Sequence, residues 1–113
     1  MFYQAVHQRL NSIARKQSTT SYSEIAPLAQ LEMDNPHHRE LMRQMLYEIN
    51  RHEHGVGHPL LSAVVIYMDG NGPGRGFFTC AQELGLYKGR NDAEEEAFWV
   101  SELSGVYEFW VNH

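Results

Sequence analysis

Cysteine and long apolar runs are scarce in this chain, and their scarcity excludes internal disulfides and membrane-spanning segments. Its 113 residues include one cysteine, Cys80, which we expect to be a small buried residue. No disulfide can form within the chain, as is usual in a reducing compartment. The apolar run from Ala63 to Tyr67 is far too short to span a membrane. Residues 1–7 lack the basic start and the apolar core of a signal peptide. We therefore expect a cytoplasmic protein without a membrane partner.

Basic residues are absent from the last part of the chain. From Asn91 onward there is no Lys or Arg, and six residues are acidic: Asp92, Glu94, Glu95, Glu96, Glu102 and Glu108. The net charge of −5 therefore comes from this last part of the chain. The charges of residues 1–90 nearly balance, because this part holds nine basic residues and eight acidic ones. The overall charge does not by itself exclude nucleic acid as a partner.

Length and apolar content predict one globular domain over residues 1–113. Apolar residues make up 42% of the chain and aromatic residues 12%, which is too much for a disordered protein. A chain of this length has no room for a second core.

Apolar spacing and capping residues predict helices over 3–16, 21–29, 36–54 and 77–84, and a last one that Asp92 caps. Ser21 and Glu24 have the spacing of a capping box, in which Glu24 reaches back to the Ser21 amide. Pro27 should keep that helix short. Asn35 followed by Pro36 is a strong start signal for the third helix. Its apolar face is predicted from spacings of three and four: Leu41, Met42, Met45, Leu46 and Ile49.

The segment from Leu60 to Tyr67 predicts a buried strand, and the glycine-rich residues 70–76 predict the tip of a hairpin. The predicted fold class is therefore α+β: a small, mostly helical domain with a short β-hairpin, built like an elaborated winged helix. The predicted core consists of Ile25, Leu28, Leu41, Met45, Ile49, Leu61, Val64, Ile66, Phe77, Phe78, Leu84, Phe98, Leu103 and Val106.

The segment from Thr20 to Ala26, TSYSEIA, resembles the TYGEIA opening of winged-helix domains, with Leu28 and Leu31 behind it. It is most similar to the DNA-binding domain of the alkylguanine alkyltransferases and alkyltransferase-like proteins. In those proteins a second helix follows, and then an apolar segment that leads to a glycine-rich loop, which is the order of this chain. The resemblance implies a helix-turn-helix pair and DNA as a ligand. It does not extend to alkyl transfer, because residues 61–64 (LSAV) stand where the family has its Pro-Cys-His-Arg active-site segment.

A second pattern lies further along the chain, and the two resemblances together cover most of residues 18–110. The segment from Leu60 to Phe78 resembles a PLLSAVV…PGxGFF pattern of small uncharacterised bacterial proteins. Their aromatic ending is matched by Phe98-Trp99 and by Phe109-Trp110. This resemblance implies no particular activity.

Six side chains are candidates for a binding surface. They are Arg39, Arg43, Gln44, Tyr47 and Arg51 on the 36–54 helix, and Arg75 in the glycine-rich turn. Such side chains reach bases and phosphates from a recognition helix, and the glycine amides beside Arg75 would suit a phosphate. The alternative is a solvated helix face on which Arg43 pairs with Glu40, Tyr47 or Glu48.

Other chemistry finds little support in the sequence. His54 and His58 have the spacing of helical metal ligands, but Gly55 and Gly57 should end the helix between them. Ser62 lacks the glycine-flanked elbow of a hydrolase nucleophile. We predict no catalytic residue, no metal and no cofactor.

The leading hypothesis is a non-catalytic binding module, which binds nucleic acid through the 36–54 helix and the 70–76 turn. The alternative is an acidic inhibitor or immunity-type protein. Its terminal helix, with Asp92, Glu94, Glu95, Glu96 and Glu102, would neutralise a basic protein such as a nuclease toxin. Trp99 and Trp110 would suit a homodimer seam as readily as the core.

Overall fold

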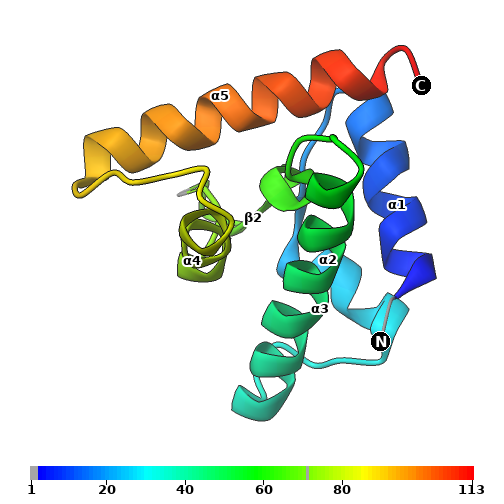
Figure 1. Cartoon of the computed structure of the whole chain (residues 1–113). Coiled ribbons are helices and arrows are strands. Elements are labelled where there is room, and N and C mark those ends of the chain that lie inside the picture. The colour runs from blue at the N-terminus through cyan, green and yellow to red at the C-terminus, as the bar shows by residue number, and fades with distance from the viewer. Residues whose placement is uncertain (1–2, 71) are drawn as a thin grey trace.

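The computed structural model describes residues 3–70 and 72–113 as a mostly helical domain (Figure 1). In chain order its elements are α1 (Gln4–Arg15), β1 (Thr20–Ser21), α2 (Tyr22–Ile25), the 3-10 helix η1 (Ala26–Ala29), α3 (Pro36–Gly55), the 3-10 helix η2 (Leu61–Val64), β2 (Val65–Ile66), α4 (Arg75–Glu83) and α5 (Asp92–Trp110). Across the described ranges, no helix combines the length and the apolar character that a membrane crossing needs.

The η2 segment lies at the centre of the fold. It contacts α1, α3 and α5, and every side chain from Leu60 to Val65 is buried. In Figure 1, α5 lies across the top of the view, while α1 and α3 run beneath it. The Tyr107 hydroxyl of α5 donates to the Ser18 carbonyl at 2.8 Å, which ties α5 to the segment after α1. The long helices thus surround one central segment.

The predicted helix starts are confirmed at α2 and α3. Ser21 Oγ accepts the Glu24 amide at 3.1 Å, as an N-cap should. The predicted reach of Glu24 to the Ser21 amide is replaced by a bond at 3.2 Å from the Ser21 hydroxyl to the Glu24 carboxylate. Asn35 Oδ1 accepts the amides of the second and third residues of α3. Pro27 lies in η1, so α2 is short as predicted.

The start of α5 differs by one residue from the prediction. Asn91, not Asp92, is the N-cap, and its side chain accepts the Glu94 amide at 2.9 Å. Asparagine and aspartate cap equally well, so a sequence that contains both in succession does not decide between them.

The predicted hairpin is wrong. β1 and β2 pair in parallel, with Thr20 opposite Val65 and Ser21 opposite Ile66. The predicted strand over 60–67 is reduced to β2, because Leu61–Val64 form a 3-10 turn instead. A continuous apolar run is compatible with a buried strand or a buried helical segment, and periodicity cannot separate them. Among the described residues, the glycine turn leads into α4 and not into a returning strand.

The core lies around η2 and includes buried side chains of α1, α3, α4 and α5. Ile25, Met45, Ile49, Leu61, Val64, Phe77, Phe78 and Val106 are buried as predicted. Leu28, Leu41, Ile66, Leu84, Phe98 and Leu103 are only partly buried. The list of predicted core residues lacked those of α1, where Val6, Leu10 and Ala14 are buried. Cys80 is buried, as expected.

Candidate functional site

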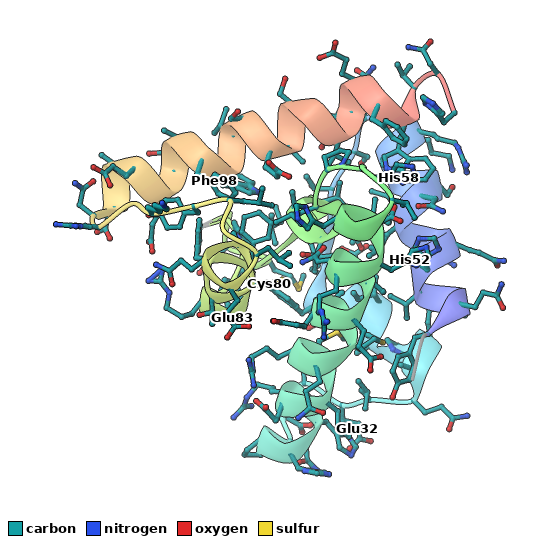
Figure 2. The ribbon with its side chains drawn as sticks, viewed as in Figure 1. Glu32, His52, His58, Cys80, Glu83 and Phe98 are labelled. Atoms are coloured by element: carbon teal, nitrogen blue, oxygen red, sulfur yellow. The ribbon has the colours of Figure 1, made fainter. Side chains whose placement is uncertain are left out.

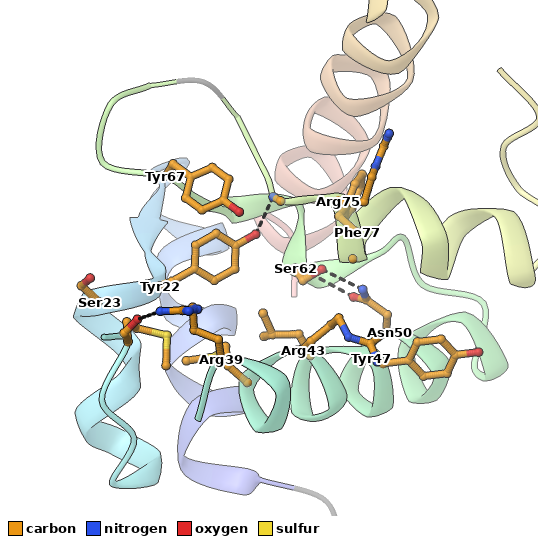
Figure 3. Close-up of a pocket in the computed structure, with 15 residues that line it drawn as sticks. Tyr22, Ser23, Arg39, Arg43, Tyr47, Asn50, Ser62, Tyr67, Arg75 and Phe77 are labelled. Atoms are coloured by element: carbon orange, nitrogen blue, oxygen red, sulfur yellow. Dashed lines mark hydrogen bonds between the residues drawn. The ribbon is translucent and has the colours of Figure 1, made fainter. Parts of the chain in front are cut away.

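A pocket of about 370 Å³ lies between α3 and the glycine turn that precedes α4 (Figure 3). Its volume is in the range of pockets that bind small molecules. The residues that line it come from four separate regions of the chain: Tyr22, Ser23, Met33, Arg39, Met42, Arg43, Leu46, Tyr47, Asn50, Ser62, Tyr67, Gly74, Arg75, Gly76 and Phe77.

Glycines let the turn and the first residues of α4 approach the pocket closely. The Gly74 amide donates to the Tyr22 hydroxyl at 2.7 Å. A Cβ atom at Gly74 would lie 2.8 Å from the Tyr67 hydroxyl oxygen, and one at Gly76 would lie 2.8 Å from Arg43 Cγ. Neither position has room for a side chain unless its neighbour moves. Glycine at both positions therefore permits this close approach.

One wall of the pocket is aromatic. The rings of Tyr22 and Tyr67 are tilted against each other with centroids 5.1 Å apart. Burial raises the pKa of Tyr22 to about 12, so its hydroxyl stays neutral at physiological pH. Apolar side chains, Met42, Leu46 and Phe77, line other parts of the pocket. The pocket therefore suits a ligand with an apolar, planar body.

The inner end of the pocket is polar. Asn50 and Ser62, which are 1% and 3% exposed, form two hydrogen bonds with each other. Asn50 Nδ2 donates to Ser62 Oγ at 2.7 Å, and the Ser62 amide donates to Asn50 Oδ1 at 3.1 Å. Asn50 Nδ2 also lies 3.9 Å from Cys80 Sγ. Burial raises the pKa of Cys80 to about 11, which keeps this thiol neutral.

Arginines line the pocket, and each has a partner within the chain. Arg39 donates to the Met33 carbonyl at 2.9 Å. Arg43 pairs with Glu40, with Nε 2.9 Å from Oε2. This pairing is the alternative that the sequence left open for Arg43. Its hydrogen bonds, with a further one from Gln44, lower the pKa of Glu40 to about 2.

Arg75 lies at the start of α4, where it pairs with Glu95 of α5. Its guanidinium also lies over the Phe78 ring, 5.2 Å from the centroid. On this side of Arg75 there is a second hollow of about 490 Å³, which Asp92, Glu95, Glu96 and Trp99 help to line. Arg75 therefore stands between an aromatic pocket and an acidic one.

The structure brings together four of the six predicted binding residues. Arg39, Arg43, Tyr47 and Arg75 line the pocket. The other two are not among its lining residues: Gln44 donates to Glu40 at 3.2 Å, and Arg51 lies 5.9 Å from the centroid of the Tyr47 ring. The Tyr47 hydroxyl donates to Glu83 of α4, which raises the pKa of Tyr47.

The sequence did not predict the side chains that form the aromatic wall and the polar inner end of the pocket: Tyr22, Tyr67, Asn50 and Ser62. Tyr22 lies in α2 and Tyr67 directly follows β2. The resemblance of residues 20–26 to winged-helix domains gives Tyr22 no particular role, and Tyr67 stands in no binding motif. The signal available for Asn50 was its spacing on α3: it comes four residues after Leu46 and eight after Met42, so it lies on the same face as these apolar residues. A polar residue on such a face needs a buried partner, but the sequence does not identify Ser62 as that partner.

A buried carboxylate lies apart from the pocket, near the end of α3. Glu53 is 1% exposed, with His7 Nε2 3.5 Å from its Oε2 and His58 Nδ1 3.5 Å from its Oε1. Figure 2 shows His52 and His58 in this region. Within residues 3–70 and 72–113, no group of three or more His, Cys, Asp and Glu side chains is arranged to hold a metal ion.

No protein-family model matches this chain, and no curated protein or solved structure is significantly similar to it. Its function must be argued from the pocket and from the charges around it.

Proposed function

We propose that this protein is a non-catalytic nucleic-acid-binding module that takes one unstacked base into the pocket between α3 and the glycine turn. The observation that carries the proposal is the combination of an aromatic, apolar pocket with three arginines that line it. Proteins that bind an extruded base hold it between aromatic or apolar side chains and bind its polar edge by hydrogen bonds. The pocket offers both kinds of contact, with rings on one wall and Asn50 and Ser62 at the inner end.

The arginines are suited to bind the phosphates on either side of such a base. Arg43 and Glu40 have side chains that are 47% and 46% exposed, so their pairing stabilises the fold by no more than about 1 kcal/mol. A phosphate can compete with Glu40 for Arg43 because it also accepts two parallel hydrogen bonds from a guanidinium. Arg75 is 67% exposed and is accessible in the same way.

A winged-helix-like architecture is part of the proposal. α2 and η1 would be the first helical unit of a helix-turn-helix pair, and α3 the second, which enters a groove. The resemblance of residues 20–26 to winged-helix domains supports this assignment. The glycine turn would take the place of a wing, although α4 follows it in the chain.

Fluorescence anisotropy with labelled duplexes tests the proposal. We expect a duplex with one unpaired base to bind about tenfold more tightly than the fully paired duplex, since stacking one base on aromatic side chains contributes about 1–3 kcal/mol. Replacing Arg39, Arg43 and Arg75 together by Ala should abolish binding to both. Arg9→Ala, on the exposed surface of α1, is the control. Full affinity in the triple variant would contradict the proposal.

The second candidate is an inhibitor of a basic protein, and the acidic hollow beside Arg75 favours it. Asp92, Glu95, Glu96 and Trp99 would there receive a Lys or Arg side chain of the partner. A lysine- and arginine-rich peptide tests it by isothermal titration. Binding that is lost in an Asp92→Asn, Glu96→Gln double variant supports the candidate, and the absence of any heat of binding contradicts it.

A further inference from the structure

We infer that Ser62 determines which bases the pocket accepts, by donating a hydrogen bond to a carbonyl oxygen on the edge of the base remote from its sugar. This inference rests on the proposed function and gives the pocket a preference among bases. Uracil, thymine and guanine present such an oxygen, whereas cytosine and adenine present an amino group.

The hydrogen bonds of Asn50 leave Ser62 with a proton to donate. A serine hydroxyl has one proton and two lone pairs. Asn50 Nδ2 donates to Ser62 Oγ at 2.7 Å and so occupies one lone pair. Among the residues that the structure describes, none accepts a hydrogen bond from this hydroxyl. The Ser62 proton is therefore available to a ligand that reaches the inner end of the pocket.

Asn50 and Ser62 hold each other in place through two hydrogen bonds. The Ser62 amide donates to Asn50 Oδ1 at 3.1 Å, so the Asn50 amide group has both its oxygen and its nitrogen engaged. This second bond fixes which end of Asn50 donates. Figure 3 shows both bonds between Asn50 and Ser62, with Tyr22 and Tyr67 on the side of the glycine turn. The tyrosine hydroxyls are thus separate from the inner end, where Ser62 lies.

The preference arises because a base with a carbonyl leaves only a lone pair of Ser62 without a partner, whereas a base with an amino group leaves the Ser62 proton without one. A carbonyl oxygen would accept the Ser62 proton and satisfy it. An amino group could donate to the remaining lone pair, but the buried hydroxyl proton would then have no acceptor. Buried donors without partners are the rarer and less tolerated case in proteins. Ser62 is 3% exposed, so water from outside does not readily replace the missing acceptor.

Uracil and cytosine give a matched pair of probes, because they have the same size and differ at this edge. Two duplexes that carry either base unpaired at the same position are titrated against the protein by anisotropy. We expect the uracil duplex to bind about fivefold more tightly, as one hydrogen bond allows. In Ser62→Ala the two affinities should become equal. Ser62→Thr, which keeps the hydroxyl, should retain the preference, as should Ser23→Ala, which removes another hydroxyl that lines the pocket.

The readout is the ratio of two affinities, which a general loss of stability would not change. Thermal unfolding establishes that each variant is folded. Should Ser62→Ala fail to fold, Ser62→Cys supplies a weaker donor of similar size and should reduce the preference. Equal binding of both duplexes by the native protein, or an unchanged ratio in the folded Ser62 variant, overturns the inference and leaves the proposed function standing. If the native protein binds neither duplex, the proposed function fails and this inference fails with it.

Discussion

Gly74 decides how closely the turn can approach the two tyrosines of the pocket. Its amide donates to the Tyr22 hydroxyl, and a Cβ atom would lie 2.8 Å from the hydroxyl oxygen of Tyr67 and 3.2 Å from that of Tyr22. We expect Gly74→Ala to push the turn outward and to destabilise the fold by about 1–3 kcal/mol, as overpacking usually does. Urea denaturation measures the change.

Gly55 is the matched control for this substitution. It lies at the end of α3, and a Cβ atom there would have no heavy atom within 4 Å. Gly55→Ala should therefore stabilise the protein by about 0.5–1 kcal/mol, because alanine loses less backbone entropy in a helix. A loss of stability at Gly55 as large as that at Gly74 would show that the close approach to the tyrosines is not the cause.

The Cys80 thiol should be inert in the folded protein. Burial raises its pKa to about 11, so at pH 8 only about one thiol in a thousand is ionised. We expect 5,5′-dithiobis(2-nitrobenzoate) to label the native protein slowly at pH 8, and the protein in guanidinium chloride at once. Rapid stoichiometric labelling of the native protein would contradict the buried position of Cys80 against Asn50.

At the scale of elements, α2 depends on its cap because it has only four residues. Ser21 accepts the Glu24 amide and donates to its carboxylate. We expect Ser21→Ala to lower the free energy of unfolding by about 1 kcal/mol, the usual contribution of an N-cap. Ser23→Ala, at an exposed position of the same helix, should change it by less than about 0.5 kcal/mol. Equal losses in the two variants, measured by urea denaturation, would exclude the cap as the cause.

Elements whose signals are local could be predicted from the sequence. Asn35 and Pro36 start α3 by their own side-chain chemistry, and Ser21 caps α2 across three residues. The sheet could not be predicted, because the pairing of Thr20 with Val65 joins segments 45 positions apart and involves two residues on each side. Nothing in the apolar run of residues 60–67 indicates where a 3-10 turn gives way to a strand.

The residues of the candidate site also fall into two groups: those that the sequence could predict locally and those that only the fold brings together. Arg39, Arg43 and Tyr47 share one helix, so residue type and position on α3 were enough to select them. The pocket itself results from long-range packing, since Tyr22 meets the Gly74 amide across 52 positions of the chain. Asn50 and Ser62 are 12 positions apart and meet only because η2 packs against α3. Such encounters are set by the fold and not by a motif.

At the scale of the whole molecule, charge is distributed so that a protein of net charge −5 still has arginines gathered around one pocket. The excess of acidic residues lies in α5, which holds six of them and no Lys or Arg. Glu95 is the point where the two regions meet, because it pairs with Arg75. In the proposed function, the arginines around the pocket would attract a polyanion and α5 would oppose its binding.

This distribution predicts the salt dependence of nucleic-acid binding. Three phosphate contacts should give a plot of log K against log salt concentration with a slope of about −2.7, at about −0.9 for each contact on a duplex. Arg43→Ala should weaken binding and make the slope less steep by about 0.9, the contribution of one phosphate contact.

Glu40→Gln should strengthen binding and leave the slope unchanged, since it removes the carboxylate that competes for Arg43 and leaves Arg43 in place. The pKa of Glu40, about 2, lies far below the range from pH 5 to 8, so the carboxylate stays ionised and the gain should not vary with pH there. An unchanged slope in Arg43→Ala, measured by anisotropy at five salt concentrations, would mean that the phosphates bind elsewhere on the molecule.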